Sequence, residues 1–129
     1  MKALVSELKP QEYRYDVVVG VSIGSLNTAI FSTFEKGNEA EAVAYLENIW
    51  ANTDSQDLWN WWPYVNIAGG LWYKSFLDSS PLHVKAANWL ANRTLKRKVG
   101  MQAVDINTGK IVMFDETVPQ DMLAEETVA

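Results

Sequence analysis

The sequence predicts a single α/β domain with a mostly parallel sheet and a β-hairpin, on the basis of three observations. Residues 17–21 read VVVGV, an apolar, β-branched run that suits a strand covered by helices on both faces. Apolar residues at helical spacing follow this strand at once, and two strand-like runs joined by a short turn lie near the C-terminus. A chain of 129 residues is long enough for one core.

Helices are expected before and after this first strand. One over residues 1–8 ends before Pro10, because proline cannot continue a helix. A second helix starts after Gly24 and breaks at Gly37, and a third covers residues 39–51. In the first helix Leu4, Val5 and Leu8 lie on one side, and in the second Leu26, Ile30, Phe31 and Phe34 keep helical spacing. The third helix is expected to bury a stripe of Ala42, Val43, Leu46, Ile49 and Trp50.

Residues 52–80 are expected to be irregular, since tryptophans, tyrosines, a proline and two glycines interrupt any regular period. A further helix starts at Ser80 as N-cap, has Pro81 as its first residue and runs to about Arg93. The basic run at residues 93–98 is interpreted as the solvated end of this helix, because cations suit the last helical turn.

The C-terminal third is expected to hold a β-hairpin. Its strands read VGMQAVDI at residues 99–106 and KIVMFD at residues 110–115, and the sequence NTG joins them. The segment after Pro119 looks like the start of another helix. The predicted order is therefore helix, strand, three helices and hairpin, an α/β pattern that is open at both ends.

The composition excludes several classes of function. A net charge of -5 with one short basic run argues against nucleic acid as a partner. The chain has no cysteine and one histidine, which excludes a disulfide framework, thiolate chemistry and a zinc site, so neither a metal nor a cofactor is expected. No signal peptide and no apolar run of membrane-spanning length is present, so the chain is expected to be soluble or peripheral, in an unknown compartment.

The main candidate for chemistry is Ser22, in the stretch Gly20-Val21-Ser22-Ile23-Gly24. This stretch matches G-x-S-x-G, in which a sharp turn from strand to helix presents a serine nucleophile, and here a strand leads in and a helix leads out. Gly20 and Gly24 are expected because a Cβ on either side of such a turn would collide. The N–H of Ile23 is a candidate oxyanion donor. The alternative is a structural turn serine; Ser25 is expected to be a first-turn helix residue.

A serine nucleophile needs a base within hydrogen-bond reach. In a Ser-Asp-His hydrolase the histidine comes last, and the only candidate pair here is Asp78 and His83. Five residues are a short separation for groups that should come from different loops, and His83 is expected on a helix surface. The triad is therefore the weaker hypothesis for activating Ser22.

Three stretches in order resemble the patatin-like phospholipases. VVVGVSIGSLNTAI has that family's serine followed by a small residue, an apolar residue and asparagine, here Ser25, Leu26 and Asn27. FLDSSPLHVKAANWL resembles the segment in which Ser-Pro-Leu opens a helix, and AVDINTGKIVMFDE resembles its strand-turn-strand. The resemblance implies a three-layer α/β/α hydrolase that cleaves glycerolipid or phospholipid esters through an acyl-enzyme, with a Ser-Asp dyad and peripheral membrane contact.

Two of the family's motifs are not in residues 1–129. The resemblance implies a catalytic aspartate in an Asp-Gly motif after the hairpin and a glycine-rich oxyanion loop before the first helix, and the sequence contains neither. Asp105 lies in the hairpin and is not given the aspartate role. Residues 1–129 are therefore expected to form one partial domain, from a fragment or a truncated gene model, that is feeble or inactive alone.

A tryptophan-rich segment, residues 58–76, carries four of the six tryptophans. Such rings favour membrane interfaces and could dock on lipid or line an acyl-chain groove. Alternatively they form a satellite core that packs a long loop onto the helices. This segment also supplies the second functional hypothesis, a non-catalytic remnant that binds lipid or a protein partner through its aromatic residues.

Overall fold

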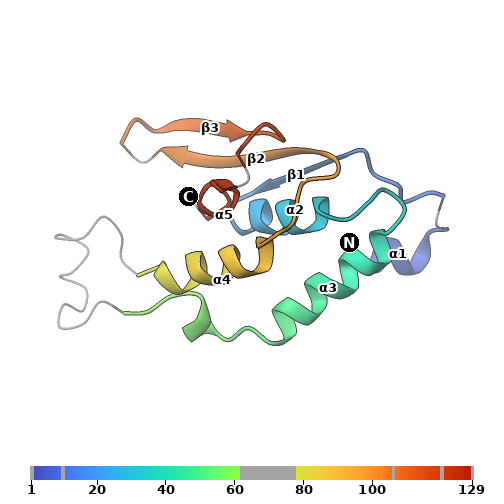
Figure 1. Ribbon diagram of the computed structural model, residues 1–129, viewed down its shortest axis with the longest axis horizontal. Helices are drawn as coiled ribbons and strands as arrows, with labels where there is room; N and C mark the ends of the chain where they lie inside the picture. The colour runs from blue at the N-terminus through green and yellow to red at the C-terminus, as the bar shows by residue number, and fades with distance from the viewer. Residues whose placement is uncertain (1, 10, 62–77, 106, 120, 129) are drawn as a thin grey trace.

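The computed structural model describes residues 2–9, 11–61, 78–105, 107–119 and 121–128, and Figure 1 shows a sheet with helices packed beneath it. The elements, in chain order, are α1 (Lys2–Glu7), β1 (Val17–Val21), α2 (Ile23–Ser32), α3 (Glu39–Ala51), the short 3-10 helix η1 (Ser55–Asp57), α4 (Ser80–Leu90), β2 (Lys98–Asp105), β3 (Lys110–Phe114) and α5 (Leu123–Glu126). This confirms the predicted order of elements and an α/β fold. Most of the tryptophan-rich segment lies outside the described residues.

The sheet has the order β1-β2-β3. β1 and β2 are parallel, with Gly20 opposite Met101, whereas β2 and β3 form the expected antiparallel hairpin, with Met101 opposite Phe114. Gly109 in the hairpin turn has φ +67°, which suits glycine, and its N–H donates to the Asp105 carbonyl at 2.7 Å. β1 is therefore an edge strand among the described residues, and its C-terminal end is followed directly by α2.

The two faces of the sheet differ in what covers them. Val18 on β1 and Met101 on β2 face α2 and are buried. On the opposite face Val17, Val19 and Val21 are 53%, 62% and 58% exposed, because none of the described elements packs there. The expectation that helices cover both faces of this strand is thus wrong for the described residues, which form two layers.

The core lies between the sheet and the helices α2, α3 and α4. α2 packs against both β1 and β2 and also contacts α3 and α4. The buried stripe predicted for residues 39–51 is confirmed except at Trp50, which is half-buried. Leu26, Ile30 and Phe31 of α2 are buried as well. The six-residue helix α1 contacts α3; Val5 is half-buried against the core, whereas Leu4 and Leu8 are exposed.

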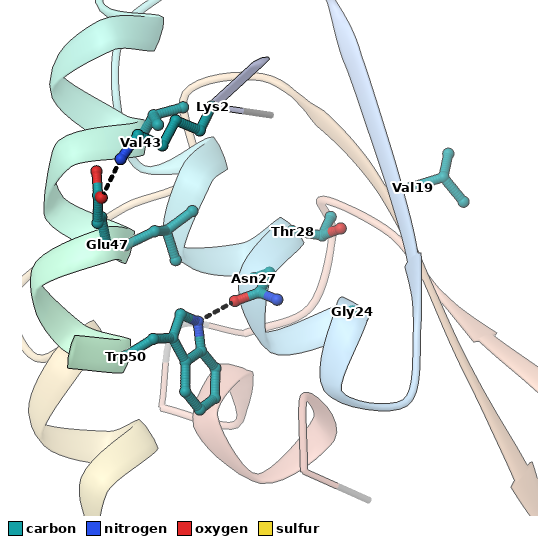
Figure 2. Close-up of a pocket in the computed structure, with 9 residues that line it drawn as sticks. Lys2, Val19, Gly24, Asn27, Thr28, Val43, Glu47 and Trp50 are labelled. Atoms are coloured by element: carbon teal, nitrogen blue, oxygen red, sulfur yellow. Dashed lines mark hydrogen bonds and ion pairs between the residues drawn. The ribbon is translucent and has the colours of Figure 1, made fainter. Parts of the chain in front are cut away.

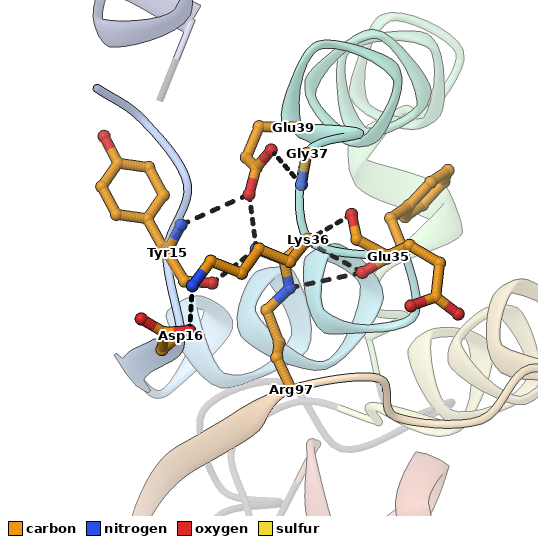
Figure 3. A network of polar contacts seen from close by, with 8 residues as sticks. Tyr15, Asp16, Glu35, Lys36, Gly37, Glu39 and Arg97 are labelled. Carbon is orange, nitrogen blue, oxygen red and sulfur yellow. Dashed lines mark hydrogen bonds and ion pairs between the residues drawn. The ribbon is translucent and has the colours of Figure 1, made fainter. Parts of the chain in front are cut away.

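The basic run at residues 93–98 is not the solvated end of a helix, because α4 ends at Leu90. Arg93 lies over the ring of Tyr45, 4.2 Å from its centroid. Arg97 is buried and its Nη1 donates to Glu39 Oε1 at 2.9 Å (Figure 3). The interpretation of this run as a solvated helix end is therefore wrong. These contacts have no local signature in the sequence, because Tyr45 and Glu39 lie far from the two arginines along the chain.

Arg97 and Glu39 form the centre of a polar cluster at the N-terminal end of the parallel strands, which we call the arginine clamp. The guanidinium also donates to the carbonyls of Tyr15, Phe34 and Glu35, each at 2.9 Å. Glu39 accepts the N–H groups of Tyr15 and Gly37 at 3.3 and 2.8 Å. Burial raises the pKa of Glu39, but the hydrogen bonds from Arg97 and the backbone outweigh it, so the pKa is lowered overall.

Candidate active site

Ser22 occupies a sharp turn between β1 and α2. Its φ is 55° and its ψ is -129°, a backbone conformation that residues other than glycine rarely adopt. The side chain is exposed and makes no capping hydrogen bond to α2, although serine at this position normally does so. The hydroxyl therefore does not hold the turn together, and strained residues of this kind cluster at functional sites.

The two glycines around Ser22 have different roles. A Cβ on Gly20 would lie 2.1 Å from the carbonyl oxygen of Gly24 and 2.5 Å from the hydroxyl of Thr28. A Cβ on Gly24 would meet no atom within 4 Å among the described residues. The expected collision is thus confirmed at Gly20 and wrong at Gly24, which instead lines a cavity.

Ser25 is buried in the first turn of α2, as expected of a helix residue. Its hydroxyl lies 3.0 Å from the carbonyl of Gly20 and 3.4 Å from the carbonyl of Gln102. The N–H of Ser22 also donates to the Gln102 carbonyl, at 3.4 Å. Ser25 therefore ties α2 to the ends of β1 and β2, a role that the sequence did not reveal because Gln102 is 77 residues away.

Ile23 is the first residue of α2. Its N–H belongs to the first-turn donors, which have no acceptor within their own helix, and the positive end of the helix dipole lies here. Ile23 is half-exposed, at 46%. These features are compatible with its expected role as an oxyanion donor, which stays a prediction.

One cavity opens at Ser22 itself, and we call it the serine cavity. Its volume is about 440 Å³, and its lining includes Ser22, Ile23, Leu58, Trp59, Leu82 and Val128. Leu58 and Trp59 follow η1, Leu82 lies in the first turn of α4, and Val128 follows α5. Three segments far apart in the sequence thus form an apolar wall beside the serine.

A second cavity lies on the other side of the turn, and we call it the helix cavity. It has a volume of about 420 Å³ and is lined by residues of β1, α2, α3 and α1, among them Lys2, Gly24, Asn27, Leu46, Glu47 and Trp50 (Figure 2). Within it Trp50 Nε1 donates to Asn27 Oδ1 at 2.8 Å, and Lys2 pairs with Glu47. Asn27 of the serine motif therefore joins α2 to α3.

The other candidate groups lie elsewhere. His83 is half-buried on α4, and among the described residues no hydrogen bond joins its side chain to Ser22 or Asp78. The carboxylate of Asp78 accepts both the N–H and the hydroxyl of Ser80, and these bonds lower its pKa. No hydrogen bond among the described residues therefore supports a Ser-Asp-His triad.

Asp105 lies in the hairpin turn, as the resemblance implies. Its carboxylate accepts the hydroxyl of Thr108 at 2.7 Å and the N–H of Asn107 at 2.9 Å, and these bonds lower its pKa. Both carboxylate oxygens are thus used to shape the turn, which is consistent with leaving Asp105 out of the catalytic groups.

Two kinds of feature are absent from the described residues. No helix there is long and apolar enough to cross a bilayer. No cluster of three or more histidine, aspartate or glutamate side chains there could hold a metal ion. Of the tryptophan-rich segment, Trp59 and Trp61 are described, and they are 41% and 73% exposed.

The fold and the site define an α/β protein in which a sheet strand enters a helix through a strained, exposed serine. The family model of the patatin-like phospholipases matches residues 1–116, which extend from α1 to just past β3. The chain belongs to the patatin-like phospholipase family. No curated protein and no solved structure matches it. At the level of the family, this membership indicates a lipid hydrolase.

Proposed function

We propose that this chain carries the nucleophile of a serine lipid acyl hydrolase, and that the nucleophile is Ser22. The observation that supports this most directly is the backbone of Ser22, at φ 55° with a hydroxyl that makes no capping bond. A structural turn serine would use its hydroxyl to cap α2. The substrate class, an ester of a glycerolipid or phospholipid, comes from the family and not from the geometry.

The proposed reaction is acyl transfer in two steps. The Ser22 oxygen attacks the ester carbonyl carbon, and the hydroxyl proton passes through the partner base to the leaving alcohol as the ester bond breaks. Water then attacks the acyl carbon, one of its protons passes through the base to the Ser22 oxygen as the bond to Ser22 breaks, and the fatty acid is released. The N–H of Ile23 donates to the oxyanion in both steps.

The base and the remaining oxyanion donors belong to the Asp-Gly motif and the glycine-rich loop of the family. We propose that residues 1–129 are one part of a three-layer hydrolase domain that is completed by these two motifs. Each missing oxyanion donor raises the barrier by roughly 3 to 4 kcal/mol. The chain by itself is accordingly impaired or inactive as an enzyme.

The proposal is tested by labelling with a fluorophosphonate probe that carries a fluorophore. The chain is compared with a chimaera that supplies a glycine-rich loop upstream and an Asp-Gly segment downstream from a patatin-like phospholipase. The chimaera should be labelled strongly and the chain weakly, and Ser22→Ala should abolish labelling of both. Ser6→Ala is the matched control, because Ser6 is an exposed serine on α1. A folded chimaera that stays unlabelled would contradict the proposal.

A second candidate function is a non-catalytic domain that binds lipid or a protein partner through its aromatic residues. Trp59 and Trp61 favour it, since both rings are exposed. The test is co-sedimentation of the chain with phosphatidylcholine vesicles. Binding that is lost in Trp61→Ala and kept in Ser22→Ala, with no labelling of the chimaera, would support this function over hydrolysis.

A further inference from the structure

We propose that Ser25 is a positioning residue for the nucleophile, and that its buried hydroxyl holds Ser22 in the strained conformation from which it attacks. This inference rests on the proposed function, because it assigns to Ser25 a role in the reaction of Ser22. The argument starts from the strain itself. A residue at φ 55° keeps this conformation only where the surrounding structure enforces it. Contacts around the turn must therefore supply that restraint.

The side chain of Ser22 does not supply the restraint, since its hydroxyl makes no capping bond to α2. The backbone of Ser22 is bound on both sides. Its N–H donates to the Gln102 carbonyl at 3.4 Å, and its carbonyl accepts the N–H of Ser25 at 2.7 Å. The first bond is longer than is usual for an N–H donor, so it is a weak link to β2. A further contact between the turn and the strands is needed.

The hydroxyl of Ser25 makes that contact. It lies 3.0 Å from the carbonyl oxygen of Gly20 and 3.4 Å from that of Gln102, and Ser25 is 3% exposed. A hydroxyl has a single proton, so the nearer carbonyl, that of Gly20, is its main acceptor. Gly20 precedes the turn, and Ser25 follows it in the first turn of α2. The bond therefore closes a ring around Ser22 and ties the start of the helix to the strand.

Steric contact limits movement of the same two elements in the opposite direction. The backbones of Gly20 and Gly24 lie so close that a Cβ on Gly20 would be 2.1 Å from the Gly24 carbonyl oxygen. The start of α2 consequently has no room to move closer to β1. The bond of Ser25 opposes the reverse movement, in which the helix draws away and the φ of Ser22 relaxes. The two restraints together fix Ser22 relative to the N–H of Ile23.

This arrangement should matter for the reaction more than for binding. Attack requires the Ser22 oxygen and the Ile23 N–H to be aligned with the ester carbonyl at the same time. Loss of the Ser25 hydroxyl should lower kcat roughly 10- to 100-fold, because a misplacement of about 1 Å can cost about 100-fold in rate. The KM should stay nearly unchanged, since Ser25 is buried behind the turn and contacts no substrate.

Ser32 provides a matched control in the same helix. It is fully buried in α2, and its hydroxyl has no hydrogen-bond partner among the described residues. Ser25→Ala and Ser32→Ala thus remove the same atom from buried positions of one helix, and only the first removes a bond across the turn. Ser25→Thr keeps a hydroxyl and should restore most of the lost rate.

The first measurement is the labelling of the chimaera by a fluorophosphonate. The end point counts the folded sites, and the rate per site reports how well Ser22 is positioned. Ser25→Ala should reach the end point of the unsubstituted chimaera at a lower rate, and Ser32→Ala should match it in both. A lower end point with an unchanged rate per site would show that Ser25 is only structural. That result, or equal rates and end points, would overturn the inference.

The second measurement needs no chemistry and separates this inference from the proposed function. Hydrogen exchange of the Ser22 amide is followed by NMR in residues 1–129 and compared with the amides of β2. Ser25→Ala should speed exchange at Ser22 about fivefold more than in β2, for the loss of one ordinary hydrogen bond, and Ser32→Ala should not. Faster exchange with no labelling of any chimaera would keep the restraint by Ser25 and refute the hydrolase. Unchanged exchange would overturn the inference and leave the hydrolase standing.

Discussion

The two ends of β1 are built in opposite ways. At the N-terminal end the arginine clamp pairs the buried charges of Arg97 and Glu39 with each other and with five surrounding backbone groups. At the C-terminal end Ser22 has a strained backbone and a hydroxyl without a capping bond. Five residues of strand separate the two. The difference shows that hydrogen bonds and an ion pair order one end of the strand, whereas the turn at the other end carries backbone strain.

The largest expected loss of stability comes from removing the ion pair at the centre of the arginine clamp. Glu39→Gln leaves the buried guanidinium of Arg97 without its counter-charge, and loss of one partner of a buried pair costs about 3 to 5 kcal/mol. The free energy of unfolding from urea denaturation measures this. Glu35→Gln is the control, because its pair with Lys96 is exposed and is worth at most about 1 kcal/mol. Equal effects of the two variants would contradict the role given to the clamp.

The second effect sharpens the contrast between the two glycines of the turn. Gly20→Ala places a Cβ against the backbone of Gly24 and should cost about 3 kcal/mol or more. Gly24→Ala meets no described atom and lies in the first turn of α2, where alanine is the better helix former, so stability should rise by up to about 1 kcal/mol. Thermal unfolding of both variants tests this, and a similar loss in both would show that Gly24 is also sterically required.

Much of this architecture could be predicted from residue spacing alone. The bounds of α3 agree with the prediction because its apolar face has a regular helical period and Gly37 and Asn38 precede it. Arg97 was misassigned because its partner Glu39 is 58 residues away, and a lone arginine in a basic run has the local pattern of a surface residue. The exposure of Val19 was missed because apolarity indicates what a strand face prefers and not which elements cover it.

The site could be predicted in part. The position of Ser22 between strand and helix follows from its flanking residues, and the collision at Gly20 follows from the tight turn. The bonds of Ser25 to the strand ends and the cavity formed with Leu58 and Leu82 depend on contacts between distant segments. No local pattern encodes such contacts.

A third, smaller effect concerns the support beneath the turn. Ser25→Ala removes the hydroxyl that contacts the carbonyls of Gly20 and Gln102 in a buried position. The loss should lower the free energy of unfolding by about 1 kcal/mol, the net worth of an ordinary hydrogen bond, because the Gln102 carbonyl keeps the N–H of Ser22 as a donor. Ser25→Thr would keep the hydroxyl. A Ser25→Ala variant as stable as the wild type would show that these bonds are not structural.

Relief of the backbone strain at Ser22 should raise the stability of the protein, whereas the preceding substitution should lower it. Ser22→Gly permits φ 55° without the cost that a Cβ imposes, so the free energy of unfolding should rise by about 1 kcal/mol. Ser22→Ala removes only the hydroxyl and should leave stability nearly unchanged. If glycine at this position is no more stabilising than alanine, the backbone of Ser22 is not strained.

The smallest effect is the pH dependence that the clamp contributes. The pKa of Glu39 is lowered on folding, so its contribution to stability is present above the unfolded value of 4.5 and is lost as the pH falls through the lower folded value. Glu39→Gln should therefore flatten the fall in the free energy of unfolding below about pH 4.5. An acid transition unchanged by this substitution would mean that other carboxylates dominate it.

The most direct test of the central claim is to locate the phosphonate adduct after labelling the chimaera. Trypsin cuts after Arg14 and Lys36, so one peptide carries Ser22, Ser25 and Ser32 and supplies its own internal controls. The account predicts that fragmentation of this peptide places the adduct on Ser22 alone. An adduct on Ser25 or Ser32, or on a serine outside this peptide, would contradict the claim that the strained turn presents the nucleophile.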